Sequence, residues 1–271
     1  MAIIPVWREL LAGTAAGPGC LSLLAALEET YGPEVYGPGG APGALARTWL
    51  PAIGQIARVG GDWWEASIAT LLGRVYRHLP PPPPDVYLGT LLFLAPAATL
   101  SLQGRPVVAV GLERFDPLCP PGMPPPRGLY HPSEVEEMLP HEAAHVARIR
   151  ALGLCPSPRD LTLADMVLLE GTALLFTDWF LGRQTLPTFM PAAEIARHQA
   201  EEAAHRAVVR GALGERGMPA FLRFFRANAP VSGYYVGLSL CREYCARTGV
   251  TPDRLVLVPT REILAAVGLG S

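Results

Sequence analysis

The sequence contains no lysine, and all 22 of its basic residues are arginine. Any mechanism that needs a catalytic lysine is therefore excluded. The formal net charge is only −2, and no basic run is long enough to form the positive face that phosphate binding needs. We therefore expect no nucleic-acid partner.

Long apolar runs and secretion signals are also missing. No uncharged apolar stretch approaches the ~20 residues that a membrane span needs. The N-terminal segment lacks a basic start, and Arg8 and Glu9 interrupt its apolar stretch, so it is a poor signal peptide. We therefore expect a protein with no membrane span.

Cysteine is scarce, odd in number and scattered. The five cysteines are Cys20, Cys119, Cys155, Cys241 and Cys245. This pattern favours buried free thiols in a reducing compartment over a disulfide framework. Together with the poor signal peptide, it predicts a cytoplasmic protein.

The chain is rich in apolar residues, proline and glycine. Hydrophobic residues make up 50% of its 271 residues, and the mean hydropathy is +0.25, so the chain can bury a sizeable core. Residues 1–79 carry apolar residues at helical spacing, broken by glycine and proline. The five consecutive prolines at 80–84 cannot be helical and act as a stiff spacer. We therefore predict an N-terminal helical subdomain, residues 1–84, followed by a second domain, residues 85–271.

The second domain is expected to combine a small sheet with helices. Residues 85–116 are rich in Val, Leu, Phe and Tyr, and Gln103-Gly104 is a candidate hairpin turn. Ser133 and Glu136 have capping-box spacing for a helix that runs to Leu152. Further helices are predicted at 161–181, 191–213, 219–227 and 234–248. The predicted fold class is α+β and mainly helical.

His141, Glu142 and His145 form an HExxH pattern. On an α-helix the two histidines lie one turn apart and only ~40° apart around the axis, so both imidazoles point the same way. Both nitrogens can then reach one Zn²⁺. Glu142 points about a quarter-turn away, where a general base must lie to take a proton from a zinc-bound water. The pattern therefore predicts a zinc site with Glu142 as its catalytic base.

A zinc site of this kind needs a third protein ligand. One class of zinc peptidases uses a histidine six residues after the second histidine, but here that position is Ala151. Glu170 is the only charged residue between Asp165 and Asp178, in a helix that is otherwise almost all apolar. A lone buried carboxylate is costly unless it is paired or metal-bound. Glu170 is therefore the predicted third ligand.

A purely structural interpretation of the same residues stays open. His141 and His145 would then face solvent, and Glu170 would pair with Arg148 or Arg150. Of the remaining histidines, we expect three at the surface: His131, His198 and His205.

Several segments together resemble a known family. HEAAHVAR, LLEGTALLF and GYYVG, followed by a helix and LVLVPTREIL, resemble the predicted zinc-dependent protease family, a bacterial group within the gluzincins. The resemblance covers roughly residues 85–265. It implies a zincin-like fold with the small sheet packed on the HExxH helix. It also implies an edge strand that pairs with extended substrate, supplied by 107–112 or 88–94.

The resemblance also bears on individual residues. Tyr234 lies in an element similar to the family's G-Y-x-x-G, which implies a role in stabilising the oxyanion, with Tyr235 as the fallback and simple packing as the alternative. Pro140 departs from the expected pattern, because a helix former should precede His141. Leu174 also departs from it, because related enzymes place an acid there to support a zinc-binding histidine. Candidates for that supporting role are Asp165, Asp178 and Thr177.

The sequence therefore predicts a zinc-dependent metallopeptidase that hydrolyses peptide bonds in a peptide or protein substrate. Two alternatives stay open. A non-catalytic zinc-binding structural or regulatory protein would keep the metal ligands without needing Glu142, whereas a non-peptidase metallohydrolase would need both. The substrate's identity and the oligomeric state do not follow from the sequence.

Overall fold

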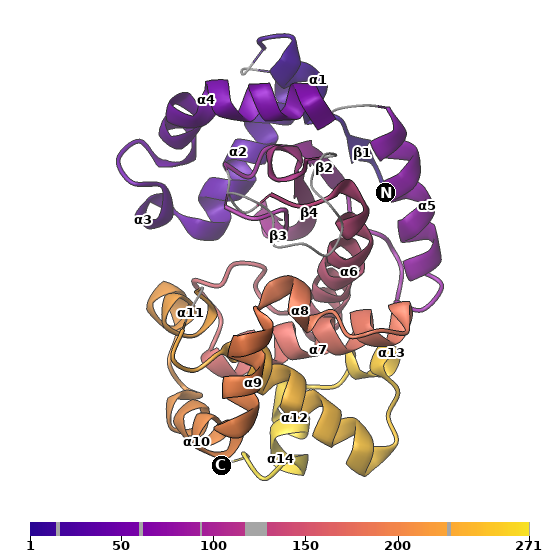
Figure 1. Cartoon of the computed structure of the whole chain (residues 1–271), viewed down its shortest axis with the longest axis vertical. Coiled ribbons are helices and arrows are strands. Elements are labelled where there is room, and N and C mark those ends of the chain that lie inside the picture. Colours follow the sequence, from indigo (N-terminus) through magenta and orange to yellow (C-terminus); the bar gives the residue numbers. More distant parts are fainter. Residues whose placement is uncertain (15–16, 60–61, 93, 117–128, 227–228, 271) are drawn as a thin grey trace. The chain divides into compact units, whose positions relative to one another are not determined.

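The structure is a computed structural model that describes residues 1–14, 17–59, 62–92, 94–116, 129–226 and 229–270 (Figure 1). It is mainly helical, with 63% helix and a small four-stranded mixed sheet among the described residues. The predicted α+β class is therefore confirmed. None of the described helices combines the length and the apolar character that crossing a membrane requires.

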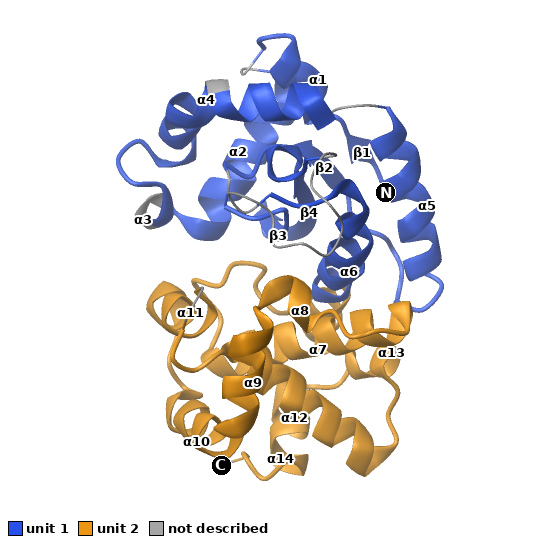
Figure 2. Ribbon diagram, viewed as in Figure 1, with its two compact units in different colours: residues 1–146 blue, residues 147–271 orange. Residues whose placement is uncertain are grey.

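The chain divides into two compact units, residues 1–146 and 147–271 (Figure 2). The predicted boundary at residues 80–84 lies inside the first unit, and the separate folding of residues 1–84 stays a prediction. The first unit contains β1 (Ile3–Ile4), α1 (Val6–Leu11), α2 (Pro18–Tyr31), α3 (Pro33–Tyr36), α4 (Gly40–Val59), α5 (Trp63–Val75), β2 (Val86–Gly89), β3 (Ala97–Leu102), β4 (Arg105–Gly111), the 3₁₀ turns η1 (Leu112–Arg114) and η3 (Pro132–Glu134), and the larger part of α6 (Val135–Leu152).

The described elements of the second unit are helices, joined by turns and loops. After the end of α6 it contains α7 (Leu163–Leu181), α8 (Leu186–Phe189), α9 (Ala192–Ala200), α10 (Glu202–Ala212), α11 (Gly217–Phe225), α12 (Gly233–Thr248), α13 (Pro252–Leu255) and α14 (Thr260–Ala266). The helix predicted at 191–213 is wrong as a single element, because the chain breaks at Glu201 and forms α9 and α10.

The sheet has the strand order β1-β2-β4-β3. Strands β1, β2 and β4 are parallel, whereas β3 and β4 form the predicted antiparallel hairpin. Its turn is Gln103-Gly104, where φ is 53° and 70°, as tight hairpin turns require. The edge strands are therefore β1 and β3. The expectation that 107–112 supplies an edge is wrong, because β4 pairs with both β2 and β3. Strand β1 pairs only with Val86 and Tyr87 of β2, so the same expectation for 88–94 stays a prediction.

The end of α2 holds the hairpin in place. The Glu29 carboxylate accepts hydrogen bonds from the backbone N–H groups of Gln103 (2.7 Å) and Gly104 (2.9 Å), and from the Ser101 hydroxyl. Thr30 Oγ1 accepts one from the Ser101 N–H at 2.7 Å. Burial raises the pKa of Glu29, but these hydrogen bonds outweigh it and keep the pKa below its ordinary value. Strand β3 is thus fixed along its outer edge as well as by β4.

Helix α6 begins differently from the prediction but ends as predicted. The capping box is formed by His131 and Glu134 around the 3₁₀ turn η3, rather than by Ser133 and Glu136. The helix then runs from Val135 to Leu152 and passes through Pro140 without ending. The HExxH residues therefore lie inside one continuous helix.

Arg148 fastens the last turns of α6 to the C-terminal segment. Its side chain is fully buried and donates hydrogen bonds to the carbonyls of Leu255 (3.3 Å) and Val258 (2.9 Å) and to the Thr260 hydroxyl (3.3 Å). A buried guanidinium needs such acceptors, because an unpaired buried charge is strongly destabilising. Arg148 therefore acts as an anchor, and it is not the partner that the structural interpretation gives to Glu170.

Helices α7 and α12 cross in backbone contact at two glycines. A Cβ atom added to Gly171 would lie 2.2 Å from the carbonyl carbon of Gly237, and one added to Gly237 would lie 2.1 Å from the carbonyl oxygen of Val167. Both distances are far below van der Waals contact, so only glycine fits at either position. The crossing fixes the part of α7 that begins with Glu170.

We expect Gly237→Ala to lower the stability of the protein by about 1–3 kcal/mol or more, because the new methyl group must push the two helices apart. Urea unfolding of the variant and the unchanged protein measures the difference. Gly211→Ala is the matched control: Gly211 is an exposed residue of α10 with no atom near an added Cβ. It should be neutral or slightly stabilising, by up to about 1 kcal/mol. Equal effects of the two changes would contradict the tight crossing.

Candidate metal centre

His141 and His145 lie one turn apart on α6, as predicted. Both are buried, with 2% and 5% of their surface exposed, so the interpretation in which they face solvent is wrong. Their ring centroids are 4.5 Å apart, and the ring planes are nearly perpendicular at 88°. Both imidazoles therefore occupy the same small volume beside the helix.

Glu170 joins the two histidines. One ring nitrogen of His141, one of His145 and one carboxylate oxygen of Glu170 all lie within 4.8 Å of one another. Among the described residues, no other group of three or more His, Cys, Asp or Glu side chains converges in this way. Two imidazoles and a carboxylate are a donor set that suits zinc. The three residues could thus hold a metal ion.

Glu142 is also buried, with 8% of its surface exposed. The Thr99 hydroxyl of β3 donates a hydrogen bond to Glu142 Oε2 at 2.8 Å and lies 3.2 Å from the Glu142 carbonyl oxygen. Thr99 could not be found from local sequence patterns, because it lies 43 positions from Glu142. The predicted base is therefore connected to the sheet.

Tyr234 and Tyr235 point to different neighbours. Tyr235 donates a hydrogen bond from its hydroxyl to Glu202 Oε2 at 3.0 Å. Burial, followed by this bond to Glu202, raises the pKa of Tyr235 to about 12. Tyr234 packs beside Phe225 and Phe189, with ring centroids 5.3 Å and 6.3 Å away. Both tyrosines pack against the apolar cluster that contains Leu174.

Leu174 follows Glu170 by one helical turn, so this cluster includes a residue of α7 close to the carboxylate. Leu174 itself is fully buried among apolar side chains.

The three candidates for supporting a zinc-binding histidine have other partners. Asp165 accepts hydrogen bonds from the hydroxyls of Thr162 (2.6 Å) and Thr260 (2.8 Å). Asp178 accepts from the backbone and hydroxyl of Thr185 and pairs with Arg242. The Thr177 hydroxyl donates to the Ala173 carbonyl at 2.8 Å. These contacts hold α7 in place, and the residue that orients each histidine stays unassigned.

His198 and His205 are not surface residues, contrary to expectation. They are 0% and 5% exposed, and their Nδ1 atoms lie 3.1 Å apart. Arg197, which has only donors, reaches His198 Nε2 at 3.1 Å. His198 must therefore accept at Nε2 and donate from Nδ1 to His205, whose Nε2 then donates to Glu201 Oε2 at 3.0 Å. Both rings are neutral in this chain of hydrogen bonds, which joins α9 to α10.

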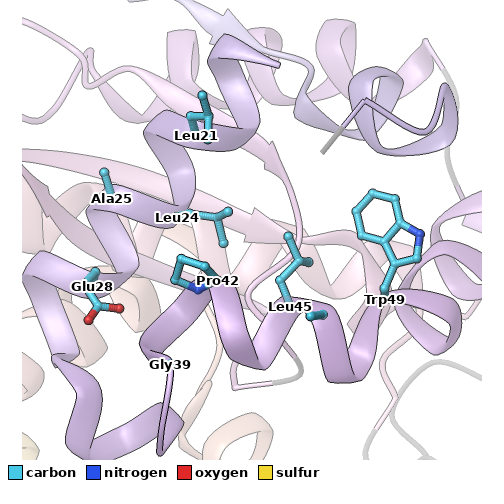
Figure 3. A pocket seen from close by; sticks show the side chains of 9 residues that line it. Leu21, Leu24, Ala25, Glu28, Gly39, Pro42, Leu45 and Trp49 are labelled. Atoms are coloured by element: carbon cyan, nitrogen blue, oxygen red, sulfur yellow. The ribbon is translucent and has the colours of Figure 1, made fainter. Parts of the chain in front are cut away.

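Two other features lie apart from the metal centre. The described cysteines are free thiols, of which Cys20 and Cys241 are buried, and burial raises the pKa of Cys241 to about 12. Cys119 lies outside the described residues. An apolar pocket of about 710 Å³ opens between α2 and α4, with Leu24, Leu45 and Trp49 in its wall (Figure 3). None of the predicted site residues lines it.

The chain is thus mainly helical and α+β, with two histidines one turn apart and a carboxylate from a second helix that could together hold a metal ion. A family model described as "Predicted Zn-dependent protease" matches residues 126–265, which is more than half of the chain. The chain belongs to this family, which confirms the resemblance seen in the sequence. No curated protein and no solved structure matches the chain significantly.

We expect the buried histidine pair to make the protein less stable in acid. Burial, followed by the charge of Arg197, lowers the pKa of His198 to about 4, whereas an unfolded histidine has a pKa of ~6.5. The folded state therefore binds fewer protons, so this contribution to stability is present above pH ~6.5 and is lost as the pH falls towards about 4.

Unfolding midpoints of the metal-free protein between pH 7 and pH 4 test this expectation. His198→Gln should flatten the dependence over that window, and changing the exposed His78 to Gln should leave it as it is. An equally steep dependence in His198→Gln would show that other groups cause it.

Proposed function

We propose that the chain is a zinc-dependent metallopeptidase of the gluzincin type that hydrolyses peptide bonds. His141, His145 and Glu170 hold the zinc ion, and Glu142 is the general base. The observation that carries the proposal is the convergence of the three donor side chains on the helix that also carries Glu142. Membership of the predicted zinc-dependent protease family supports it independently.

The donor set favours a catalytic zinc over a structural one. Structural zinc sites are usually closed by four Cys or His ligands, whereas catalytic sites use three protein ligands and keep one position open. The described group has three members and no cysteine. A zinc ion held there supplies a Lewis acid that lowers the pKa of water and polarises a carbonyl group.

The roles of the protein's own residues follow from their positions. Glu142 takes the proton from the attacking water and passes it to the leaving amine. Tyr234 donates a hydrogen bond to the oxyanion that develops on the scissile carbonyl. One contact favours Tyr234 over Tyr235: the Tyr235 hydroxyl already donates a hydrogen bond to Glu202.

The substrate is a peptide or protein in an extended conformation. Strand β3 lies at an edge of the sheet. Thr30 of α2 already accepts from the Ser101 N–H, so the part of this edge before Ser101 is the part that pairs with such a chain. The Thr99–Glu142 hydrogen bond joins β3 to α6, which supports a zincin-like arrangement of sheet and HExxH helix. The cytoplasmic location stays a prediction.

We expect Glu142→Gln to keep about one zinc per chain and to lower peptide hydrolysis by roughly 10²–10⁴-fold, because only the base is removed. Elemental analysis and turnover of a peptide library, measured on one preparation, test this. Glu136→Gln is the matched control, since Glu136 is an exposed residue of the same helix, and it should behave like the unchanged protein.

The outcomes separate the alternatives. Hydrolysis that survives Glu142→Gln contradicts the mechanism. A protein that binds zinc and cleaves no peptide favours the structural or regulatory alternative, and cleavage of other bonds alone favours a non-peptidase hydrolase.

We expect Glu170→Ala and Tyr234→Phe to differ in kind. Glu170→Ala removes a ligand. Removing a residue that only hydrogen-bonds to a ligand lowers metal affinity by roughly 10–100-fold, so the loss of zinc affinity in Glu170→Ala should be larger than that. Tyr234→Phe should leave zinc affinity unchanged and lower kcat by roughly 10²–10³-fold, because its hydroxyl acts only as the oxyanion develops. Zinc titration and steady-state kinetics measure the two effects. Tyr235→Phe is the control. If kcat falls in Tyr235→Phe and stays unchanged in Tyr234→Phe, Tyr235 is the residue that stabilises the oxyanion.

A further inference from the structure

Thr99 occupies the middle of the edge strand β3. It pairs with Val108 of β4 in the antiparallel register, and its side chain is partly buried. The neighbouring Ser101 is held by Glu29 and Thr30 of α2. The backbone that carries Thr99 is thus fixed on both sides, which makes the Thr99 hydroxyl a well-placed donor.

One hydroxyl contacts both ends of Glu142. Thr99 Oγ1 lies 2.8 Å from Oε2 of the Glu142 carboxylate and 3.2 Å from its carbonyl oxygen. A hydroxyl has a single hydrogen, and the shorter contact to a charged acceptor is the stronger one. Thr99 therefore donates to the carboxylate. Within the part of the chain that the structure describes, that carboxylate accepts one hydrogen bond, from Thr99, so Oε1 is left to accept a proton.

We propose that Thr99 is a positioning residue that fixes the orientation of the Glu142 carboxylate. This inference rests on the proposed hydrolysis for its catalytic meaning, although the contact itself does not depend on a metal ion. A glutamate side chain has three rotatable bonds, and a general base acts only within about 2.6–3.2 Å of the proton that it takes. Holding Oε2 selects one orientation before substrate binds. A misplacement of about 1 Å can cost roughly 100-fold in rate.

Kinetics of the full-length, zinc-loaded protein test the proposal. Thr99→Val keeps the shape of the side chain and removes the donor, whereas Thr99→Ser keeps the donor. We expect Thr99→Val to lower kcat by roughly 10–100-fold, with KM and zinc content within about twofold of the unchanged protein. Thr99→Ser should recover most of kcat. Unchanged or higher kcat in Thr99→Val overturns the proposal.

Ser101→Ala is the matched control on the same strand. Its hydroxyl bonds Glu29 rather than Glu142, so the change loosens β3 without touching the base. It should lower the unfolding midpoint and keep kcat. A loss of kcat in Ser101→Ala equal to that in Thr99→Val would mean that strand rigidity, and not the hydroxyl, matters, which overturns the proposal.

A measurement on the metal-free protein separates this inference from the proposed function. The unfolding midpoints of Thr99→Val, Glu142→Ala and the double variant form a cycle that isolates the interaction of the two side chains. We expect Thr99→Val to lower the midpoint clearly when Glu142 is present and much less when it is absent. Additive effects overturn the inference, even if the unchanged protein cleaves peptides. Coupled effects in a protein that cleaves no peptide support the contact and reject the proposed function instead.

Discussion

Helix α6 has to bury a row of polar side chains, and much of the structure serves that requirement. Glu137, His141, His145 and Arg148 follow one another at helical spacing, and each is at most 5% exposed. Buried polar and charged groups are tolerated only when they have partners. Arg148 finds them in the C-terminal segment, and the two histidines meet the carboxylate of Glu170. A helix of apolar residues would need none of these arrangements.

Helices α7 and α12 position the site through a close contact of their backbones. Glu170 is followed by Gly171, the residue at which α7 touches α12, and Gly237 supplies the matching position on α12. The two glycines thus explain in steric terms why glycine recurs beside the acidic residue and after the tyrosines. Their role is close approach, and it concerns the placement of Glu170 and Tyr234 rather than chemistry.

Local sequence signals predicted what depends on a few consecutive residues. The HExxH turn, the apolar helix around Glu170 and the hairpin at Gln103-Gly104 follow from helical periodicity and turn chemistry. The edge strands could not be predicted in this way, because they depend on the two-residue strand β1 near the N-terminus. Nor could the buried pair His198 and His205, which a break at Glu201 brings face to face, or the contact of Thr99 with Glu142.

Arg148 makes the stability of α6 depend on the C-terminal segment of the chain. The two carbonyls that it uses belong to Leu255 and Val258, far along the chain from α6. A protein shortened before these positions would keep every residue of the metal centre and still lose the acceptors of a fully buried cation. Proteolytic removal of the C-terminal segment would therefore destabilise α6, because Arg148 would lose its hydrogen-bond acceptors. The last helical turns are thus a structural requirement of the helix that carries the metal-binding residues.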